Sequence, residues 1–367
     1  MPKTKIICTL GPAANSATVL RKMMRSGMDV ARLNFSHAAH REHLGRILMI
    51  RQLNKKYRRH IRILGDLEGH RTRVGRLKDH KPLTLLKRQV LWLVQKEFPG
   101  HDKYVPFDYP GEVRDIAIGQ HIFIDDGNIA LVVTGRSKNS LKTKVLIGGI
   151  LKERKGINIP GAKLNFGGLT GKDKEDIFFC IKNNVDYIAQ SFVRAQEDIL
   201  HIRRILKDNP GEIKIVAKIE NREGIKNIDV IIAVSDGIMI ARGDMGISIP
   251  IYEVPMVQKE IIKKCNQGKK IVITATQMLE SMTDSHLPRR AEVSDVANAI
   301  LDGSDYLMLS AETAIGCYPA ETVEMMNQII KYTESHSVYK NEAPPRLWRG
   351  GFRKRNTERL NCSSARL

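Results

Sequence analysis

The sequence lacks a hydrophobic run long enough to cross a membrane, and it contains few cysteines. Its longest apolar segments fall well short of the roughly 20 residues that a membrane-spanning helix needs, and its first residues contain no secretory leader. The five cysteines are scattered, odd in number and without a C-x-x-C pair. These absences argue against a membrane protein, a disulfide-rich secreted domain and a zinc site. We therefore expect a cytoplasmic protein with reduced thiols.

Aromatic residues are also scarce, whereas basic residues are abundant. Aromatic side chains make up 5% of the chain, and 60 Lys and Arg against 40 Asp and Glu give a formal net charge of +20. Such a charge permits nucleic-acid binding. However, the basic residues are spread over the whole length, and no nucleic-acid motif is recognisable. We interpret the charge as a solvated surface that attracts anionic metabolites, and we do not expect a nucleic-acid partner.

Short apolar runs alternate with helical patterns along most of the chain, as in a parallel α/β fold. Strands are predicted at residues 5–10, 30–35, 61–67, 187–192, 213–219, 237–241, 271–276 and 306–309. Helices are predicted between them, for example at residues 16–26, 172–183, 197–206, 254–266, 293–301 and 320–335. Eight such units are the number in a (β/α)8 TIM barrel, whose active site lies at the C-terminal strand ends.

Two segments depart from this alternation. From residue 74 to 155, turn signals and alternating apolar residues replace the helices, which predicts a small all-β lid domain inserted after the third strand. The barrel domain then comprises residues 1–73 and 156–340. Residues 341–367 are basic and without periodicity, so we expect a disordered tail there.

The most informative residues are two carboxylates and a lysine at neighbouring strand ends. Lys218 and Glu220 close one predicted strand, and Asp244 follows the next. Side chains two residues apart on a strand point the same way, so Lys218 and Glu220 share one face. Two carboxylates beside a lysine suit a hard divalent metal that holds a phosphorylated substrate. For an isolated motif of this kind, a salt bridge across two strand ends is the alternative.

Other predicted strand ends are polar as well. Their side chains include Arg32, Asn34, Ser36, His37, Asp66, Ser191, Thr276, Ser310 and Glu312. A single Ser, Thr or Asn at such a place is more often a cap or turn residue. Six strand ends that direct charged and polar groups toward one opening exceed what capping requires, and they indicate an active site.

Five motifs in this order resemble the pyruvate kinase family, over residues 4–333. They are VARLNFSH at 30–37, KIEN at 218–221, GIMIARGD at 237–244, ATQMLESM at 275–282 and MLSAET at 308–313. The resemblance implies a barrel (A) domain, a β-rich (B) domain that acts as a lid, and phosphoryl transfer from phosphoenolpyruvate to ADP. The products would be pyruvate and ATP.

The resemblance also implies roles for residues at the strand ends. Glu220 and Asp244 match the ligands of Mg²⁺ or Mn²⁺, while Lys218 and Arg32 match contacts to the transferring phosphoryl group. The backbone N–H groups of Gly243 and Asp244, with the Thr276 hydroxyl, would hold the substrate carboxylate.

The carbon atom of the enolate must then be protonated. Thr276 and Ser310 could relay that proton through water, although free hydroxyls are poor acids.

For the nucleotide, the resemblance points to residues on both domains. Asn34, His37 and Arg73 come from the barrel, and Asp126 and Lys155 come from the lid. Closure of the lid would exclude water that would otherwise hydrolyse the phosphoryl group.

A monovalent-cation site is the first departure from the family pattern. Asn34, Ser36, Asp66 and Leu67 match the residues that bind this cation in potassium-dependent members. Arg71 stands where those members carry a glutamate and potassium-independent members carry a lysine. A fixed guanidinium could supply the charge of K⁺, so K⁺ is possible but we expect it to be dispensable.

The second departure is that no segment matches the family's C-terminal domain. The resemblance implies a homo-oligomer, and we expect a weaker one here, without the sugar-phosphate effector site of that domain. Two other functions stay open. One is a truncated, inactive pyruvate kinase relic with a binding or regulatory role, and the other is a metal-dependent aldolase or lyase that handles pyruvate enolates.

Overall fold

The computed structural model of the chain describes residues 3–109, 111–160, 168–207 and 212–336. Within these residues, eight parallel strands close into a barrel in the spatial order β1-β16-β15-β14-β13-β12-β3-β2. The strands are β1 (Lys5–Thr9), β2 (Met28–Asn34), β3 (Arg62–Asp66), β12 (Tyr187–Gln190), β13 (Lys214–Ile219), β14 (Gly237–Ala241), β15 (Ile271–Ala275) and β16 (Tyr306–Leu309). The predicted (β/α)8 barrel is therefore confirmed. The tail predicted at 341–367 lies outside the described residues.

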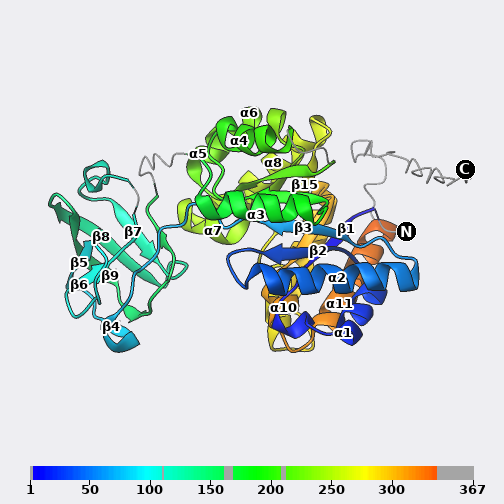
Figure 1. Cartoon of the computed structure of the whole chain (residues 1–367), viewed down its shortest axis with the longest axis horizontal. Helices are drawn as coiled ribbons and strands as arrows, with labels where there is room; N and C mark the ends of the chain where they lie inside the picture. Colours follow the sequence, from blue (N-terminus) through cyan, green and yellow to red (C-terminus); the bar gives the residue numbers. More distant parts are fainter. Residues whose placement is uncertain (1–2, 110, 161–167, 208–211, 337–367) are drawn as a thin grey trace, which may run out of the picture.

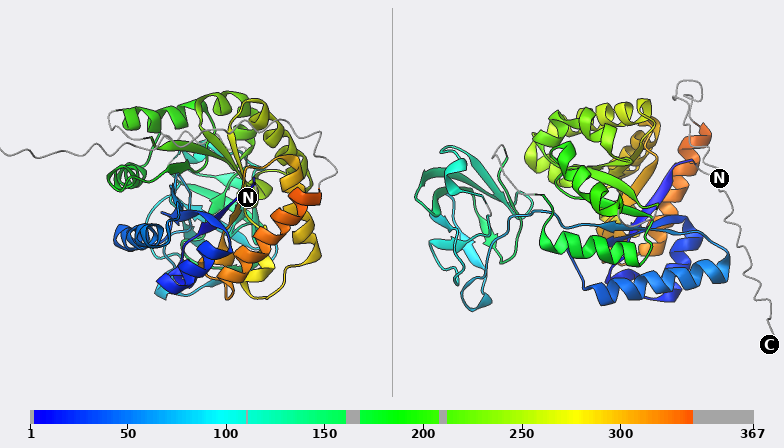
Figure 2. Two further views of the ribbon diagram at one scale, coloured as in Figure 1. Left: turned by 90° about the vertical axis from the view of Figure 1, so that its right-hand side faces the viewer. Right: turned by 45° about the horizontal axis from the view of Figure 1, so that its top comes forward.

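Helices surround the strands on all sides, as the view along the barrel in Figure 2 shows. They are α1 (Ala17–Ser26), α2 (His40–Tyr57), α3 (Gly171–Lys182), α4 (Gln196–Lys207), α5 (Arg222–Lys226), α6 (Ile228–Val234), α7 (Arg242–Ser248), α8 (Val254–Gln267), α9 (Arg290–Asp302), α10 (Ala311–Ala314) and α11 (Pro319–His336). Several begin or end at clear signals. The Ser16 hydroxyl accepts a hydrogen bond from the N–H of Val19, and α1 ends at Gly27, whose φ is +127°.

The barrel strands are apolar throughout because both of their faces are buried. Ile215, Ala217 and Ile219 of β13 pack outward against the helices. Val216 belongs instead to a second cluster inside the barrel, together with residues of the other strands. Since side chains alternate along a strand, Lys218 follows Val216 on the inner side. The alternation thus directs Lys218, near the end of β13, into the mouth of the barrel.

The lid is a separate β-rich unit beyond the C-terminal ends of the barrel strands (Figure 1). One sheet has the order β11-β7-β8-β9-β5-β6, and a two-stranded sheet joins β10 to β4. The strands are β4 (Leu83–Leu85), β5 (Val90–Val94), β6 (Tyr104–Pro106), β7 (His121–Ile124), β8 (Ile129–Arg136), β9 (Ser140–Ile147), β10 (Gly149–Leu151) and β11 (Ile157–Asn158). The lid has a hydrophobic core of its own, distinct from the two clusters of the barrel.

Two neighbouring segments connect the lid to the barrel. Arg73 on the outgoing segment forms an antiparallel bridge with Gly156 on the returning one. The short strand β11 pairs with β7, and Ile157 and Ile159 lie in the lid core. Residues just after 155, which the sequence assigned to the barrel, therefore belong to the lid sheet. The boundary shifts because apolar residues that resemble a barrel strand complete the lid core instead.

The four cysteines of the described residues, Cys8, Cys180, Cys265 and Cys317, are free thiols. Among the helices of the described ranges, none has the length and apolar character required to pass through a bilayer.

Candidate active site

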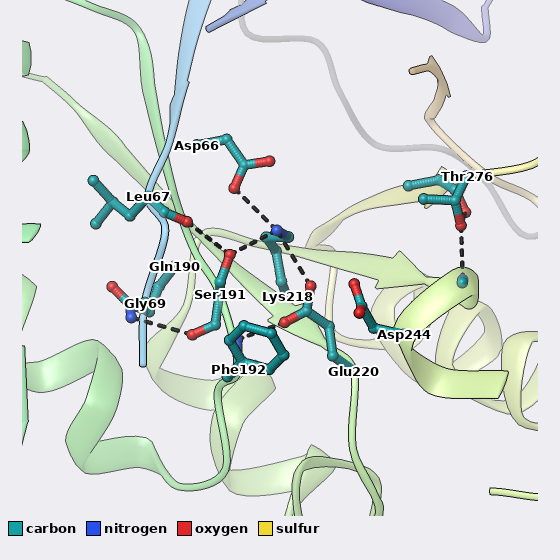
Figure 3. A network of polar contacts seen from close by, with 12 residues as sticks. Asp66, Leu67, Gly69, Gln190, Ser191, Phe192, Lys218, Glu220, Asp244 and Thr276 are labelled. Atoms are coloured by element: carbon teal, nitrogen blue, oxygen red, sulfur yellow. Dashed lines mark hydrogen bonds and ion pairs between the residues drawn. The ribbon is translucent and has the colours of Figure 1, made fainter. Parts of the chain in front are cut away.

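Polar side chains from several strands meet at the C-terminal mouth of the barrel, on the side that carries the lid. Asp66 ends β3, Ser191 follows β12, Lys218 lies near the end of β13, and Glu220 follows that strand. Asp244 lies in the first turn of α7, directly after β14. Figure 3 shows these side chains converging around the Lys218 ammonium group. Residues far apart in the sequence thus form one cluster because parallel barrel strands end at the same rim.

Lys218 is a buried cation with three partners. Its Nζ lies 2.6 Å from Oγ of Ser191, 3.1 Å from Oδ1 of Asp66 and 3.2 Å from Oε1 of Glu220 (Figure 3). Burial alone would lower the pKa of Lys218, but the charges of Asp66 and Glu220 raise it above its ordinary value. Lys218 is therefore protonated at neutral pH and fixed in place.

Asp66 holds a second cation beside the first. Its Oδ2 atom lies 2.6 Å from Nε of Arg32, whose Nη1 donates to the Thr9 hydroxyl at 2.9 Å. Burial would raise the pKa of Asp66, but the charges of Lys218 and Arg32 lower it below its usual range. The fully buried carboxylate is thus ionised. It orients both predicted phosphoryl contacts. Neither this role nor the contact with Thr9 was predicted from the sequence.

Glu220 and Asp244 bring two carboxylates together. Oε2 of Glu220 accepts a 2.6 Å hydrogen bond from the N–H of Phe192. Burial raises the pKa of Glu220, Lys218 opposes that rise, and the negative charge of Asp244 adds to it. Asp244 is next to Glu220 in Figure 3, and its side chain keeps 24% of its exposure. Burial is thus the largest cause of the raised pKa of Glu220, and the charge of Asp244 contributes less than Lys218 does in the opposite direction.

This donor set fits a hard divalent cation. A further cation between Glu220 and Asp244 would remove their mutual repulsion, and both supply oxygen ligands. Within the described ranges, no three His, Cys, Asp or Glu side chains gather to form a closed metal cage. Mg²⁺ is commonly held by one or two carboxylates, with water and substrate completing its shell. Two carboxylates at an open rim are therefore sufficient.

Thr276 follows β15 in an unusual backbone conformation. Its φ is +68°, and that of Gln277 is +55°, which is strained for residues that carry a Cβ. The Thr276 hydroxyl, labelled in Figure 3, accepts from the N–H of Gly243 at 2.9 Å. It donates to the carbonyl of Ala275 at 2.6 Å. In this structure the Gly243 N–H, expected to face a substrate carboxylate, is therefore engaged by Thr276.

Arg242 holds this loop in place. Its guanidinium donates to the carbonyl oxygens of Thr276 at 2.7 Å and of Gln277 at 3.3 Å. Its other nitrogen lies 2.7 Å from a carboxylate oxygen of Asp295 on α9. The sequence offered a weak signal for this residue, since Arg242 stands inside the motif that contains Asp244. The structure adds that Arg242 holds the backbone of Thr276 through its carbonyl oxygen.

Ser310 lies at the end of β16. Its N–H donates to Oε2 of Glu312 at 2.6 Å. Its hydroxyl is buried and has no hydrogen-bond partner among the described residues. Of the two hydroxyls predicted to relay a proton, Thr276 is therefore engaged twice, whereas Ser310 is available.

The predicted nucleotide residues are divided between the two domains, and three of them are engaged in ion pairs. Arg73 contacts Glu68 at 2.5 Å, Lys155 contacts Asp125 at 2.7 Å, and Asp126 contacts Arg71 at 3.1 Å.

On the barrel, the side-chain oxygen of Asn34 accepts a hydrogen bond from the N–H of Ser36. The carbonyl oxygen of His37 accepts a hydrogen bond from Nε2 of His43. Partial burial lowers the pKa of His37, and the positive charges of Arg73 and Arg32 lower it further. Both effects favour the neutral imidazole.

The predicted monovalent-cation residues are also engaged. Both oxygens of Asp66 face cationic side chains, and the Leu67 carbonyl accepts from Ser191 at 2.7 Å. Arg71, expected to supply the charge of K⁺, points elsewhere: its guanidinium contacts Asp126 and lies 3.7 Å from Asp244. The structure thus places Lys218 and Arg32, rather than Arg71, at this group of residues.

Comparison with known proteins gives consistent matches. The family model described as "Pyruvate kinase, barrel domain" matches residues 1–323. A pyruvate kinase of Staphylococcus epidermidis is 48% identical over 342 residues, which are 93% of this chain and 58% of that protein. One from Geobacillus stearothermophilus is 48% identical over 335 residues, or 90% of this chain and 57% of its own length. The chain therefore spans less than two thirds of these curated relatives.

A solved structure agrees. The crystal structure of a pyruvate kinase from Cryptosporidium parvum superposes with a TM-score of 0.88 at 40% sequence identity. The match covers 92% of this chain and 70% of that one.

Proposed function

Because this chain belongs to the pyruvate kinase family, we propose that it catalyses phosphoryl transfer from phosphoenolpyruvate to ADP. The products are pyruvate and ATP, as in glycolysis. The observation that carries the proposal is the buried set of Lys218, Arg32 and Asp66, in which one carboxylate fixes two cations beside the Glu220–Asp244 pair. Fixed positive charge at this place suits a phosphoryl group that gains negative charge in the transition state.

Glu220 and Asp244 are the proposed ligands of Mg²⁺ or Mn²⁺, which when bound would neutralise charge on the enolate and phosphoryl oxygens. Lys218 and Arg32 bind the phosphoryl oxygens and keep them in line for transfer. Because both cations are already held in place, little reorganisation is needed as the reaction proceeds. Gly243, Asp244 and Thr276 bind the substrate carboxylate, for which the Gly243 N–H must turn from Thr276 to the substrate.

The electron balance is simple. The bond between phosphorus and the enol oxygen breaks, its electron pair stays on that oxygen, and a new bond forms to a terminal oxygen of ADP. The enolate then takes a proton at carbon. We assign Ser310 to deliver this proton through water, since its hydroxyl is available whereas that of Thr276 is engaged. Thr276 orients the substrate carboxylate, which leaves the relay to Ser310 and water.

The nucleotide lies between the two domains in this proposal. Asn34, His37 and Arg73 contact it from the barrel, and Asp126 and Lys155 contact it from the lid. The ion pairs of Arg73 and Lys155 are exchanged for contacts to phosphate oxygens. Lid closure then excludes water from the phosphoryl group.

A coupled assay of ATP formation from phosphoenolpyruvate, ADP and Mg²⁺ tests the activity. We expect turnover in the unchanged protein and a loss of at least about a hundredfold in Lys218→Met, because a charge contact to the transition state disappears. Lys226→Met, which removes an exposed lysine of α5, is the matched control and keeps full activity. No turnover, with Lys218→Met indistinguishable from the unchanged protein, would support a non-catalytic binding or regulatory role instead.

The proton-transfer step has its own test. Pyruvate, Mg²⁺ and ATP in deuterated water should give pyruvate labelled at its methyl carbon. Ser310→Ala should slow this labelling more than it slows phosphoryl transfer. Equal slowing of both steps would contradict the role assigned to Ser310.

We further propose that K⁺ is dispensable, because fixed cations already face both oxygens of Asp66. Activity in Na⁺ should therefore change little when K⁺ replaces it, and a large gain would contradict this. A cytoplasmic location accords with the four free thiols. A homo-oligomer is supported by neighbouring exposed apolar residues before and within α8, namely Ile251, Tyr252 and Met256.

A further inference from the structure

Arg71 lies between the lid and the candidate metal site. It belongs to the segment that leads from β3 into the lid. Its Nη2 atom lies 3.1 Å from Oδ1 of Asp126, in the turn between β7 and β8 of the lid. The same nitrogen lies 3.7 Å from Oδ1 of Asp244 on the barrel. One guanidinium nitrogen thus contacts a carboxylate of each domain.

The returning segment lies close against the Arg71 side chain. A Cβ atom on Gly156 would come within 2.4 Å of Nε and 2.6 Å of Nη2 of Arg71, so a larger residue at this position would displace the guanidinium. Next to it, the N–H of Ile157 donates to the carbonyl of Thr72 at 2.7 Å, which ties the two connecting segments together. Arg71 therefore packs against the connection between the domains, where a movement of the lid would displace it.

The two carboxylates compete for this guanidinium. Asp126 is bound at hydrogen-bond distance, whereas Asp244 is reached only as a longer ion pair. A divalent cation at Asp244 would repel the guanidinium, since like charges a few ångströms apart oppose each other at the protein surface. A lid carboxylate that holds Arg71 away from Asp244 therefore favours metal binding, and a lid that releases Arg71 disfavours it.

We propose that Arg71 is a positioning residue that couples the lid, through Asp126, to the affinity of the Glu220–Asp244 site for its divalent cation; this rests on the metal site of the proposed function. By linkage the effect is reciprocal, so the cation favours the lid position in which Asp126 holds Arg71. In this role Arg71 links two domains, which is different from supplying a fixed charge in place of K⁺.

Direct binding of Mn²⁺, measured by calorimetry without substrate, tests the coupling. Arg71→Met should bind Mn²⁺ severalfold more tightly, because the competing cation is gone. Asp126→Asn should bind it severalfold more weakly, because Arg71 loses its lid partner and moves to Asp244. In the double variant Arg71→Met/Asp126→Asn, the effect of the Asp126 change should vanish.

Asp125→Asn is the matched control, since it removes the same charge one residue away but contacts Lys155 instead of Arg71. It should leave Mn²⁺ affinity close to that of the unchanged protein. If Asp126→Asn weakens binding equally with and without Arg71, the effect is a long-range charge effect and the coupling is refuted.

Asp244→Asn separates failure of the inference from failure of the metal site. If this change leaves Mn²⁺ binding intact, the proposed metal site itself is wrong. If it abolishes binding while the Arg71 and Asp126 changes act independently, the site stands and only the coupling fails.

Discussion

Asp66 is the residue on which the charge balance of the site depends. It is fully buried, and its two oxygens face the side chains of Arg32 and Lys218. Removing one member of a buried charged set leaves the others without compensation, which typically costs about 3–5 kcal/mol. The same carboxylate therefore contributes to stability and to the orientation of the catalytic cations.

We expect Asp66→Asn to lower the free energy of unfolding by about 3 kcal/mol, as measured in urea. Asp29→Asn at the opposite end of the barrel is the control. Burial raises the pKa of Asp29 above its usual value, although the charge of Lys5 opposes this. Because burial already disfavours the charged form, a neutral amide should be tolerated there. The loss of unfolding free energy should therefore stay below about 1 kcal/mol. Similar losses in both variants would contradict the role assigned to Asp66.

His43 on α2 should make stability depend on pH. Its Nε2 lies 2.9 Å from the carbonyl oxygen of His37 and donates to it, while Nδ1 is buried without a partner among the described residues. Burial, opposed by that hydrogen bond, lowers the pKa of His43 to about 4. The unfolded chain takes up this proton near its ordinary pKa of about 6.5. The stabilising effect of a neutral His43 is therefore complete above pH 6.5 and is lost as the pH falls toward 4.

At pH 5 this difference amounts to about 2 kcal/mol of unfolding free energy relative to pH 7.5. His43→Gln keeps a donor for the His37 carbonyl but cannot take up a proton. The unfolding free energy, measured in urea, should therefore fall less between pH 7.5 and pH 5 in the variant than in the unchanged protein. The two falls should differ by about 2 kcal/mol. Equal pH dependence in both proteins would show that His43 does not titrate in this way.

At the scale of elements, the loop after β15 stores backbone strain. Thr276 and Gln277 both have positive φ values, and Arg242 anchors the carbonyl oxygens of both. Such a conformation is maintained because the surrounding contacts determine it. Gln277 is exposed, so its backbone can be tested without disturbing the core.

We expect Gln277→Gly to be more stable than Gln277→Ala by about 1 kcal/mol, because only glycine adopts a left-handed conformation without a Cβ clash. Thermal unfolding of the two variants measures this difference. The opposite order would indicate that the loop is not strained at this residue.

The barrel strands could be predicted from sequence because each is apolar on both faces and short, which is characteristic of parallel strands. The helix α2 was not among the predicted examples. His43 and Arg46 lie on its buried side with Ile47 and Ile50, so polar residues interrupt the apolar period by which helices are predicted. The lid strand β11 was assigned to the barrel because pairing partners far along the chain cannot be derived from local patterns.

The cluster of Lys218, Glu220 and Asp244 could be predicted because strand ends of a barrel meet at one rim. The partners of individual side chains could not. Whether Asp66 binds a cation or orients Lys218 depends on distances between strands, and the direction of Arg71 depends on the closeness of Gly156. Tertiary packing determines these side-chain partners, and the spacing of residues in the sequence does not predict it.

At the scale of the whole molecule, the lid and the barrel have separate hydrophobic cores. A unit with its own core and only two connecting segments should be removable. We expect a variant in which a short Gly-rich linker replaces residues 74–159 to keep a cooperative unfolding transition, measured by circular dichroism. Loss of that transition would mean that the barrel needs the lid to fold.

The closure of the barrel joins parts of the chain that are made at very different times. β1 pairs with β16, and the Thr9 hydroxyl donates to the carbonyl of Leu309, 300 residues later. At about 5–20 residues per second, a ribosome needs about 15–60 s to produce that partner. The lid strands are complete long before then. A nascent chain therefore carries a finished lid and an open barrel edge, and a chaperone that shields this edge should raise the yield of folded protein.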